Sequence, residues 1–241
     1  MSTPDVPLPA DLKAAFTASP ELPTPLPPDP FPIFAEWFAQ AKAAGKTPNP
    51  DAMCLATVDP DGQPSARIVL CRGIDAARGH VTFFTNYESR KGVALAHDAR
   101  AAATFHWDHA DRQVRLEGVV TKSPSEESDA YFKSRLWESR LSAWTSAQSR
   151  PTSGRPELLV TMARVLERFG ITPATAREAW MKVPLPRPGH WGGYRLLTSR
   201  VELWLGGTGR LHDRAVWTRS LTRTPSGEVL AGAWSAMRLQ P

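Results

Sequence analysis

Cysteine and long apolar runs are scarce in this 241-residue chain. The two cysteines, Cys54 and Cys71, are too few for a disulfide framework or a four-cysteine zinc site. No uncharged apolar run approaches the roughly 18 residues of a membrane-spanning helix, so a helical membrane span is excluded. The first residues also lack the basic-then-apolar order of a secretion signal. We therefore expect a soluble, cytoplasmic protein whose thiols are buried as small apolar groups.

The common catalytic signatures are missing as well. The sequence contains no Gly-x-Gly-x-x-Gly fingerprint, no Walker loop, no Gly-x-Ser-x-Gly elbow and no His-Glu-x-x-His motif. His106, Asp108 and His109 lie close together, but on an extended strand His109 points away from the other two, and no second ligand cluster follows. We interpret this segment as the end of a strand and expect no metal site.

Basic residues are in excess over most of the chain. Residues 1–60 carry a net charge of −4 and residues 61–241 carry +9, and Arg outnumbers Lys 22 to 7. A guanidinium group binds phosphate through two parallel hydrogen bonds, so this bias favours a phosphorylated ligand, although a GC-rich genome also encodes arginine often. The basic residues are interleaved with acids, a pattern that argues against a nucleic-acid partner.

Proline is concentrated at the start of the chain. Ten of the 23 prolines fall within the first 32 residues, which predicts an extended arm over residues 1–30. A single domain is expected over 31–241, and it opens with an amphipathic helix that ends before Gly45. Four aromatic residues at helical spacing predict that helix: Phe31, Phe34, Trp37 and Phe38.

Short β-branched or alternating runs dominate the rest of the domain. Strands are expected at 53–58, 66–72, 81–85, 101–107, 113–122, 193–197, 201–205, 215–219 and 228–236. Turn residues separate them, and their close spacing favours an antiparallel barrel or sandwich over alternating β-α-β units.

Helices are expected between the two groups of strands. Residues 123–126, Ser-Pro-Ser-Glu, fit a capping box with Pro at the first helical position. The helix that follows would carry Tyr131, Arg135 and Ser139 on one face, because they are four residues apart. Two further helices are expected, over 156–169 and from 172 onward.

Two polar clusters stand out before the helical region. Arg67 and Arg72 flank an apolar tripeptide and, being five residues apart, would face opposite sides of a regular strand. Arg90 and Lys91 follow a strand that ends near Thr85, where a hydroxyl and the amides of the next helix could join them around a phosphate. The alternative for the second cluster is solvated surface.

A third cluster spans residues 204–214. Its three glycines predict a hairpin turn, after which Arg210 and His212 would share a strand face with Arg214. Three cationic or titratable groups side by side are costly unless an anion balances them, so the cluster favours a binding site.

Eight short segments carry a resemblance to a known family: Arg67-Ile68-Val69-Leu70, Phe84-Thr85-Asn86, Ser89-Arg90-Lys91, Arg112-Gln113-Val114, Tyr131-Phe132-Lys133-Ser134-Arg135, Gln148-Ser149, Trp191-Gly192-Gly193-Tyr194-Arg195 and Arg210-Leu211-His212-Asp213-Arg214. In order and spacing, from about residue 30 to the C-terminus, the chain resembles the FMN-dependent pyridoxine/pyridoxamine 5′-phosphate oxidases. The resemblance implies an α+β fold that is mostly β, an antiparallel Greek-key split β-barrel with surrounding helices. It also implies a homodimer with FMN at the subunit interface.

The resemblance assigns a large set of residues to FMN: Arg67, Ile68, Val69, Leu70, Phe84, Thr85, Arg90, Lys91, Gln113, Gln148, Ser149, Trp204 and Arg214. Within this set, Arg67, Arg90 and Lys91 would hold the phosphate and ribityl chain, with the Thr85 hydroxyl beside them.

The remaining cofactor residues would contact the ring system or complete the site from elsewhere. Gln113 would contact the flavin, and Trp204 and Arg214 would border the isoalloxazine ring. Gln148 and Ser149 would reach the cofactor from the other subunit.

The resemblance likewise implies a substrate site: Arg72, Tyr131, Arg135, Ser139, Arg210, Leu211 and His212. Tyr131, Arg135 and Ser139 would bind the phosphate of a B6 vitamer, and Arg210 and His212 would act as catalytic residues over its pyridine ring. The implied reaction oxidises the 4′ alcohol or amine to the aldehyde pyridoxal 5′-phosphate, and dioxygen is reduced to hydrogen peroxide.

Three departures from the family pattern fall mostly in the substrate half. Arg72 stands where a Lys is usual, Leu203 and Leu205 flank Trp204 where an aromatic and a polar residue are usual, and the arm has no Arg-x-x-Tyr segment. Two alternatives therefore stay open. One is a flavin oxidase acting on another ring, as phenazine-pathway relatives do; the other is a non-catalytic FMN or pyridoxal-phosphate binding protein, against which the pair Arg210 and His212 argues.

Overall fold

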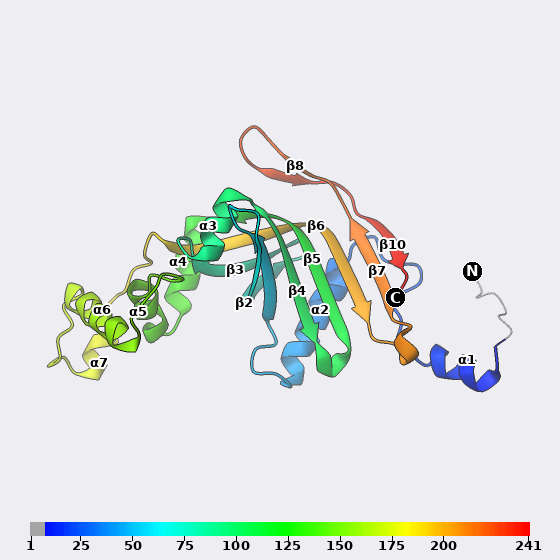
Figure 1. Ribbon diagram of the computed structural model, residues 1–241, viewed down its shortest axis with the longest axis horizontal. Coiled ribbons are helices and arrows are strands. Elements are labelled where there is room, and N and C mark those ends of the chain that lie inside the picture. Colours follow the sequence, from blue (N-terminus) through cyan, green and yellow to red (C-terminus); the bar gives the residue numbers. More distant parts are fainter. Residues whose placement is uncertain (1–7) are drawn as a thin grey trace.

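The structure, a computed structural model that describes residues 8–241, is built on an antiparallel β-barrel (Figure 1). The barrel strands are β1 (Ala52–Val58), β2 (Pro64–Asp75), β3 (His80–Asn86), β4 (Arg100–Trp107), β5 (Arg112–Lys122) and β6 (Trp191–Leu205). They follow the order β6-β3-β2-β1-β4-β5, and pairing of β5 with β6 closes the ring. The strand β7 (Asp213–Thr218) and then β10 (Ser235–Leu239) extend the sheet beyond β6, while β8 (Leu221–Arg223) and β9 (Val229–Ala231) form a separate hairpin. The α+β split-barrel fold expected from the sequence is confirmed.

The described helices are α1 (Ala10–Thr17), α2 (Phe31–Ala44), α3 (Arg90–His97), α4 (Ser125–Ser134), α5 (Trp137–Thr145), α6 (Arg155–Arg168) and α7 (Arg177–Trp180). Figure 1 shows α5, α6 and α7 grouped at one end of the barrel and α1 at the opposite end, on the same side as the C-terminus. Within residues 8–241, no helix combines the length and apolarity that crossing a membrane requires.

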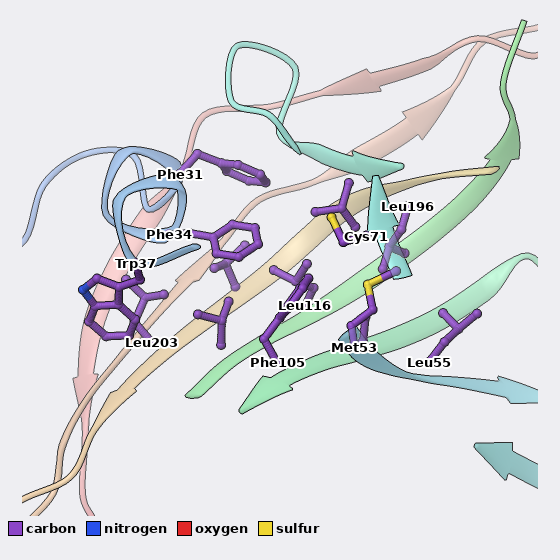
Figure 2. Packing of buried hydrophobic residues seen from close by; sticks show 14 of the residues in the cluster. Phe31, Phe34, Trp37, Met53, Leu55, Cys71, Phe105, Leu116, Leu196 and Leu203 are labelled. Carbon is purple, nitrogen blue, oxygen red and sulfur yellow. The ribbon is translucent and has the colours of Figure 1, made fainter. Parts of the chain in front are cut away.

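The main core fills the space between the barrel and α2. Phe31, Phe34 and Trp37 are buried on one face of α2, and the helix ends at Gly45, whose φ of 58° is the left-handed conformation that glycine adopts most easily. Figure 2 shows Phe34 lying toward Phe105, with ring centroids 5.3 Å apart. The aromatic pattern thus predicted this helix correctly, because burial of each such ring stabilises the fold by roughly 1.5–3 kcal/mol.

A second, smaller core lies outside the barrel. Trp137, Leu141, Ile171 and Leu185 form its buried part, against side chains of α6. The Trp144 indole also donates to the Pro186 carbonyl at 2.8 Å. This packing holds α5 beside the barrel end formed by β2 and β3.

The N-terminal arm differs from the extended segment predicted. Its residues 8–30 include the helix α1, and Leu22 is only 3% exposed. The Leu22 amide donates to Asp213 Oδ2 at 2.6 Å, and the Trp217 indole donates to the Pro27 carbonyl at 2.8 Å. Proline lacks an N–H but keeps its carbonyl, so the prolines of the arm still accept hydrogen bonds from the barrel. Residues 1–7 of the predicted arm lie outside the described residues.

The helix predicted after residues 123–126 is also different. The expected capping box does not form, since Pro124 is the N-cap of α4 and no side chain caps it. The helix ends at Ser134, Arg135 is extended (φ −72°, ψ 151°), and a new helix starts at Trp137. The prediction of a single helical face was therefore wrong, because burial of Trp137 in the smaller core requires the chain to turn first.

The turn before β7 departs from the prediction in the same way. Residues 208–210 form a 3₁₀ turn in which Arg210 has a φ of 66°, and β7 begins only at Asp213. Arg210 and His212 therefore do not share a strand face with Arg214. Contacts with the arm favour this turn, since Phe16 lies against Gly209 and Ser19 accepts a hydrogen bond from the Thr208 amide.

Three smaller differences concern element boundaries. The strands predicted at 193–197 and 201–205 are one strand, β6, whose pairing with β5 shifts register between Glu117 and Gly118. The strand predicted at 228–236 is divided into β9 and β10, and the helix predicted from residue 172 is reduced to turns followed by the four-residue α7. The two strand differences come from pairing between strands, which local sequence patterns do not report.

Candidate functional site

A cavity of about 530 Å³ lies between the barrel and the helices α4 and α5. Eleven of the residues expected in the site line it: Ile68, Val69, Leu70, Arg72, Phe84, Thr85, Lys91, Tyr131, Arg135, Ser139 and Gln148. The break between α4 and α5 does not scatter Tyr131, Arg135 and Ser139, since all three face the same cavity. Cofactor and substrate residues thus meet in one place.

Further cavity residues escaped the sequence reasoning. Asn86, Leu136, Ser142, Ala143, Ser146 and Trp191 also line the walls. Ser142 and Ser146 follow Ser139 at helical spacing, and this spacing in the sequence already indicates that the three hydroxyl groups face the same side. Trp191 opens one of the segments that match the family, although no role had been assigned to it.

Lys91 lies at the first turn of α3 and is 9% exposed. Its Nζ donates to Thr85 Oγ1 and Gln148 Oε1, each at 2.9 Å, and to Ser89 Oγ at 3.2 Å. All three acceptors are neutral. Burial, together with the nearby charge of Arg67, lowers the pKa of Lys91 to about 8. The site thus contains a buried cation without an acidic hydrogen-bond partner.

Gln148 meets Lys91 within one chain. The resemblance assigns Gln148 and Ser149 to the other subunit, whereas in the structure the Gln148 amide oxygen accepts hydrogen bonds from Lys91 Nζ and, at 3.3 Å, from Thr85 Oγ1 of its own chain. The segment reaches this position because the Asn86 side chain donates to the Ser146 carbonyl at 3.4 Å.

Arg67 is likewise surrounded by neutral acceptors. Its guanidinium donates to Thr57 Oγ1 and Ser65 Oγ, each at 2.7 Å, and to the Leu55 carbonyl at 3.2 Å. Burial lowers the pKa of Arg67, while the charge of Asp59 acts in the opposite direction. The side chain is not part of the cavity lining, but its charge acts on Lys91.

Arg135 is the third cation of this group. Its guanidinium lies 4.6 Å from the ring centroid of Trp191, and its buried Nη1 has no hydrogen-bond partner. Burial lowers its pKa. Phe84 stacks on Tyr131 at 3.9 Å and on Trp191 at 5.6 Å, so an aromatic wall adjoins the guanidinium. Arg72 differs from Arg135, since Asp51 already pairs with it at 2.7 Å.

Arg90 and Ser149 lie outside this cavity. They line a neighbouring hollow, where Arg90 donates to Asp59 Oδ2 from both Nε and Nη2. The ion pair raises the pKa of Arg90 through its hydrogen bonds. Asp59 Oδ1 is buried without a partner. Arg90 therefore faces an acid, although a phosphate was expected there.

The remaining expected residues form a second group around β5, β6 and β7. Gln113 is paired with Trp204 and Trp204 with Arg214, so the three lie in one row across the sheet. The His212 ring lies 4.6 Å from that of Trp204, and its Nδ1 is 3.2 Å from the Gly207 amide. Arg210 and Leu211 are exposed.

The two groups lie at opposite ends of β6. Trp191 borders the cavity and Trp204 belongs to the row, and a strand advances about 3.3 Å per residue, so about 40 Å of strand separates them. Figure 1 shows β6 running from the helices α3 and α4 to the turn before β7. A ligand that contacted both Trp191 and Trp204 of one chain would have to span this length of strand. Within residues 8–241, no three His, Cys, Asp or Glu side chains gather as metal ligands would.

Comparison with known proteins identifies the family. The model for pyridoxamine 5′-phosphate oxidase matches residues 39–169, and that for the pyridoxine 5′-phosphate oxidase C-terminal dimerisation region matches residues 191–241. The pyridoxine/pyridoxamine 5′-phosphate oxidase of Cupriavidus necator is 47% identical over 232 residues, covering 96% of this chain and 98% of that protein. The one from Burkholderia orbicola is 48% identical over 214 residues, covering 89% and 90%.

Solved structures agree on the fold. PhzG from Burkholderia lata, in complex with tetrahydrophenazine-1-carboxylic acid, matches with a TM-score of 0.71 and 29% identity over 89% of this chain and 94% of that one. An FMN-binding protein from Nostoc punctiforme has a TM-score of 0.59 at 17% identity, with 87% and 95% covered. The relatives cover nearly the whole chain, and the match to the oxidase model spans more than half of it. On these grounds, the chain belongs to the pyridoxine/pyridoxamine 5′-phosphate oxidase family.

Proposed function

We propose that this chain is an FMN-dependent oxidase that converts pyridoxine 5′-phosphate or pyridoxamine 5′-phosphate to pyridoxal 5′-phosphate, with dioxygen reduced to hydrogen peroxide. The observation that carries the proposal is the group Arg67, Lys91 and Arg135 in and beside one cavity. Among the described residues, no carboxylate accepts a hydrogen bond from any of these three cations. Buried charges are normally paired, so these cations favour binding of anions. The phosphate of FMN and the phosphate of the substrate would be those anions.

The residues around Lys91 suit the phosphate end of FMN. Lys91 and Arg67 provide cations, and Thr85 and Gln148 provide polar groups already directed at Lys91 Nζ. A phosphate accepts charge-assisted hydrogen bonds from both cations, and each such bond contributes roughly 1.5–3 kcal/mol. When bound, FMN would supply the hydride acceptor for C4′ and the route of the electrons to dioxygen.

The residues around Arg135 suit the substrate. We propose that Arg135, Tyr131 and Ser139 bind its phosphate, with Arg72, whose charge is balanced by Asp51, at the same wall. Arg72 carries a planar fork where the family usually has an ammonium group, but it keeps the positive charge. The arm lacks the Arg-x-x-Tyr segment that would close over the substrate, so we expect a more open pocket and a raised Michaelis constant.

The catalytic pair would come from the turn before β7. The Gly207 amide donates to His212 Nδ1, which leaves the proton of the neutral ring on Nε2. That N–H is then available to orient or polarise the substrate, and Arg210, being exposed, is free to lie over the pyridine ring.

The distance along β6 between the two groups of site residues bears on how the chains assemble. We propose a homodimer in which the cavity of one chain is completed by Gln113, Trp204, Arg214 and the Arg210–His212 turn of its partner. The family model that spans residues 191–241 describes a dimerisation region, which supports this arrangement. Two sites per dimer would result from the twofold symmetry.

One experiment tests the activity directly. The purified protein is loaded with FMN and mixed anaerobically with pyridoxine 5′-phosphate or pyridoxamine 5′-phosphate; we expect the flavin absorbance to bleach and to return with peroxide when air is admitted. Lack of bleaching with both compounds, despite bound FMN, would refute the assigned substrate.

The likeness to PhzG favours a second candidate, an oxidase of a reduced phenazine carboxylate. The same anaerobic assay with that compound separates the two activities. Bleaching by the phenazine alone would move the assignment to it, and bleaching by neither would leave a flavin-binding protein.

A further inference from the structure

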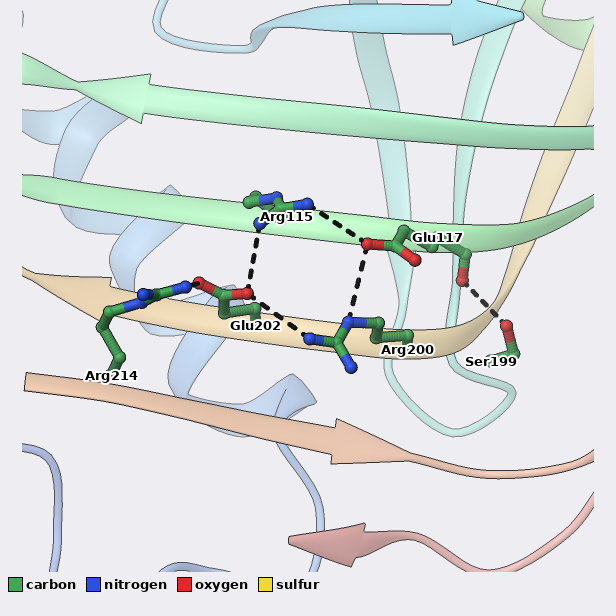
Figure 3. Close-up of polar contacts among 6 residues, drawn as sticks. All are labelled: Arg115, Glu117, Ser199, Arg200, Glu202 and Arg214. Carbon is green, nitrogen blue, oxygen red and sulfur yellow. Dashed lines mark hydrogen bonds and ion pairs between the residues drawn. The ribbon is translucent and has the colours of Figure 1, made fainter. Parts of the chain in front are cut away.

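An ion-pair network covers the outer face of β5, β6 and β7 (Figure 3), and it shares Arg214 with the row of Gln113, Trp204 and Arg214. The network joins three arginines to two glutamates: Arg115, Arg200 and Arg214 with Glu117 and Glu202. Its centre is the Glu202 carboxylate, whose side chain is 2% exposed. The network thus contains a buried carboxylate that neither the fold nor the proposed chemistry has so far explained.

The two oxygens of Glu202 have separate tasks. Oε1 accepts from Arg214 twice, from Nη2 at 2.7 Å and from Nε at 3.1 Å. Oε2 lies 3.3 Å from Arg115 Nη1 and 3.7 Å from Arg200 Nη2. One oxygen therefore holds Arg214, and two further arginines hold the carboxylate from its other side.

Arg214 is consequently fixed in orientation. Besides its two bonds to Glu202, its Nη1 donates to the Gln240 carbonyl at 2.9 Å. Removing a carboxylate from water costs several kcal/mol, and a buried ion pair often adds little net stability. A buried glutamate of this kind is better explained by the geometry it imposes on its partner than by the stability of the barrel.

We propose that Glu202 is a positioning residue for the cofactor: it holds the Arg214 guanidinium at the angle at which Arg214 borders the flavin ring. The inference rests on the proposed function, because it takes Arg214 as a ligand of FMN. Glu202 itself would touch no part of FMN, and Arg115 and Arg200 would act one step further away by fixing Glu202.

A change in FMN affinity on Glu202→Gln distinguishes two roles of Glu202, because positioning of Arg214 and simple balance of its charge predict changes of opposite sign. The change Glu202→Gln removes one negative charge, and FMN is an anion, so loss of a mere counter-charge would tighten binding. Loss of positioning has the opposite effect. Gln offers one oxygen and one NH2 group, and the NH2 group must then face guanidinium donors of Arg214 or Arg115.

Glu117→Gln is the matched control. Glu117 belongs to the same network and carries the same charge, and it contacts Arg115 and Arg200 but not Arg214. Because the two variants change the charge of the network equally, a difference between them is not an effect of net charge, and the double variant with Arg214→Ala then tests whether it acts through Arg214.

The experiment is a titration of FMN into apo-protein, followed by flavin fluorescence, for wild type, both variants, Arg214→Ala and the double variant Glu202→Gln with Arg214→Ala. We expect Glu202→Gln to weaken FMN binding about tenfold and Glu117→Gln to change it by less than about twofold. If Glu202 acts through Arg214, the double variant should bind FMN no more weakly than Arg214→Ala alone.

Two results would overturn the inference: unchanged or tighter binding in Glu202→Gln, or the same tenfold loss when Arg214 is already absent, which would indicate a structural role. Failure of wild-type apo-protein to bind FMN would refute the proposed function instead. Thermal melting checks that Glu202→Gln is folded. If it is not, Arg214→Lys serves as the second variant, because it keeps the charge but cannot make both bonds to Oε1; wild-type affinity there would also contradict the proposal.

Discussion

FMN binding should weaken as the pH rises above 8, because Lys91 loses its proton there. Lys91 is buried against Thr85, Ser89 and Gln148, and its pKa is lowered to about 8. In the apo-protein below pH 8 the ammonium group is charged and ready for a phosphate. Above pH 8 it is neutral, so binding of the phosphate must first return a proton to Nζ. The complex therefore loses affinity in alkaline solution.

The magnitude follows from the pKa. If the phosphate keeps Lys91 protonated in the complex, the dissociation constant grows by the factor 1 + 10^(pH − pKa), which makes binding about tenfold weaker at pH 9 than at pH 7. FMN fluorescence titrations of the apo-protein between these pH values measure the effect. Calorimetry in buffers of different ionisation enthalpy adds a second measure, an uptake of about half a proton on binding at pH 8.

Lys91→Arg is the control for this prediction. Arginine keeps its proton throughout the range, so its profile should be flat above pH 7. A flat profile in the wild type would refute the role of Lys91 as the phosphate ligand. A decline of equal size in Lys91→Arg would assign the titration to another group.

Three further outcomes are expected. Arg135→Ala should raise the Michaelis constant for phosphorylated vitamers about 10- to 100-fold without loss of FMN, measured by peroxide production and flavin fluorescence. His212→Ala should lower turnover. Random mixed dimers of the Arg135→Ala and His212→Ala chains should recover about a quarter of wild-type activity, since about a quarter of the sites then carry neither change. A lack of recovery would contradict a site shared between the two chains. Burial raises the pKa of Cys71 to about 12, so iodoacetamide at pH 8 should leave Cys71 unmodified in the folded protein, as mass spectrometry would show.

The barrel was predictable because its signal is local. Along β5, Val114 and Leu116 point into the core while Arg115 and Glu117 face outward, and this alternation is visible in the sequence. The packing of the arm was not predictable in this way. Its prolines indicate extended backbone, but the hydrogen bond from the Trp217 indole to Pro27 joins residues 190 positions apart.

The residue types of the site were visible in the sequence, but their partners were not. Arg90 and Lys91 are adjacent and were assigned to one phosphate, yet the start of α3 directs Lys91 at Thr85 and Arg90 at Asp59. Successive residues of a helix point about 100° apart, so neighbours in sequence need not share a ligand. Only the contacts distinguish a cation without an acidic partner from one that is already paired.

Hydrogen bonds within the chain also indicate which site residues one chain supplies. A sequence motif carries no information about which copy of the chain supplies each residue, and the resemblance assigned Gln148 to the other subunit. The hydrogen bond from Lys91 to Gln148 places that residue with the cavity of its own chain. Trp204 lies about 40 Å away along β6, so in the proposed homodimer the row around Trp204 comes from a partner. The mixed-dimer experiment depends on this division, because it restores activity only when Arg135 and His212 of one site belong to different chains.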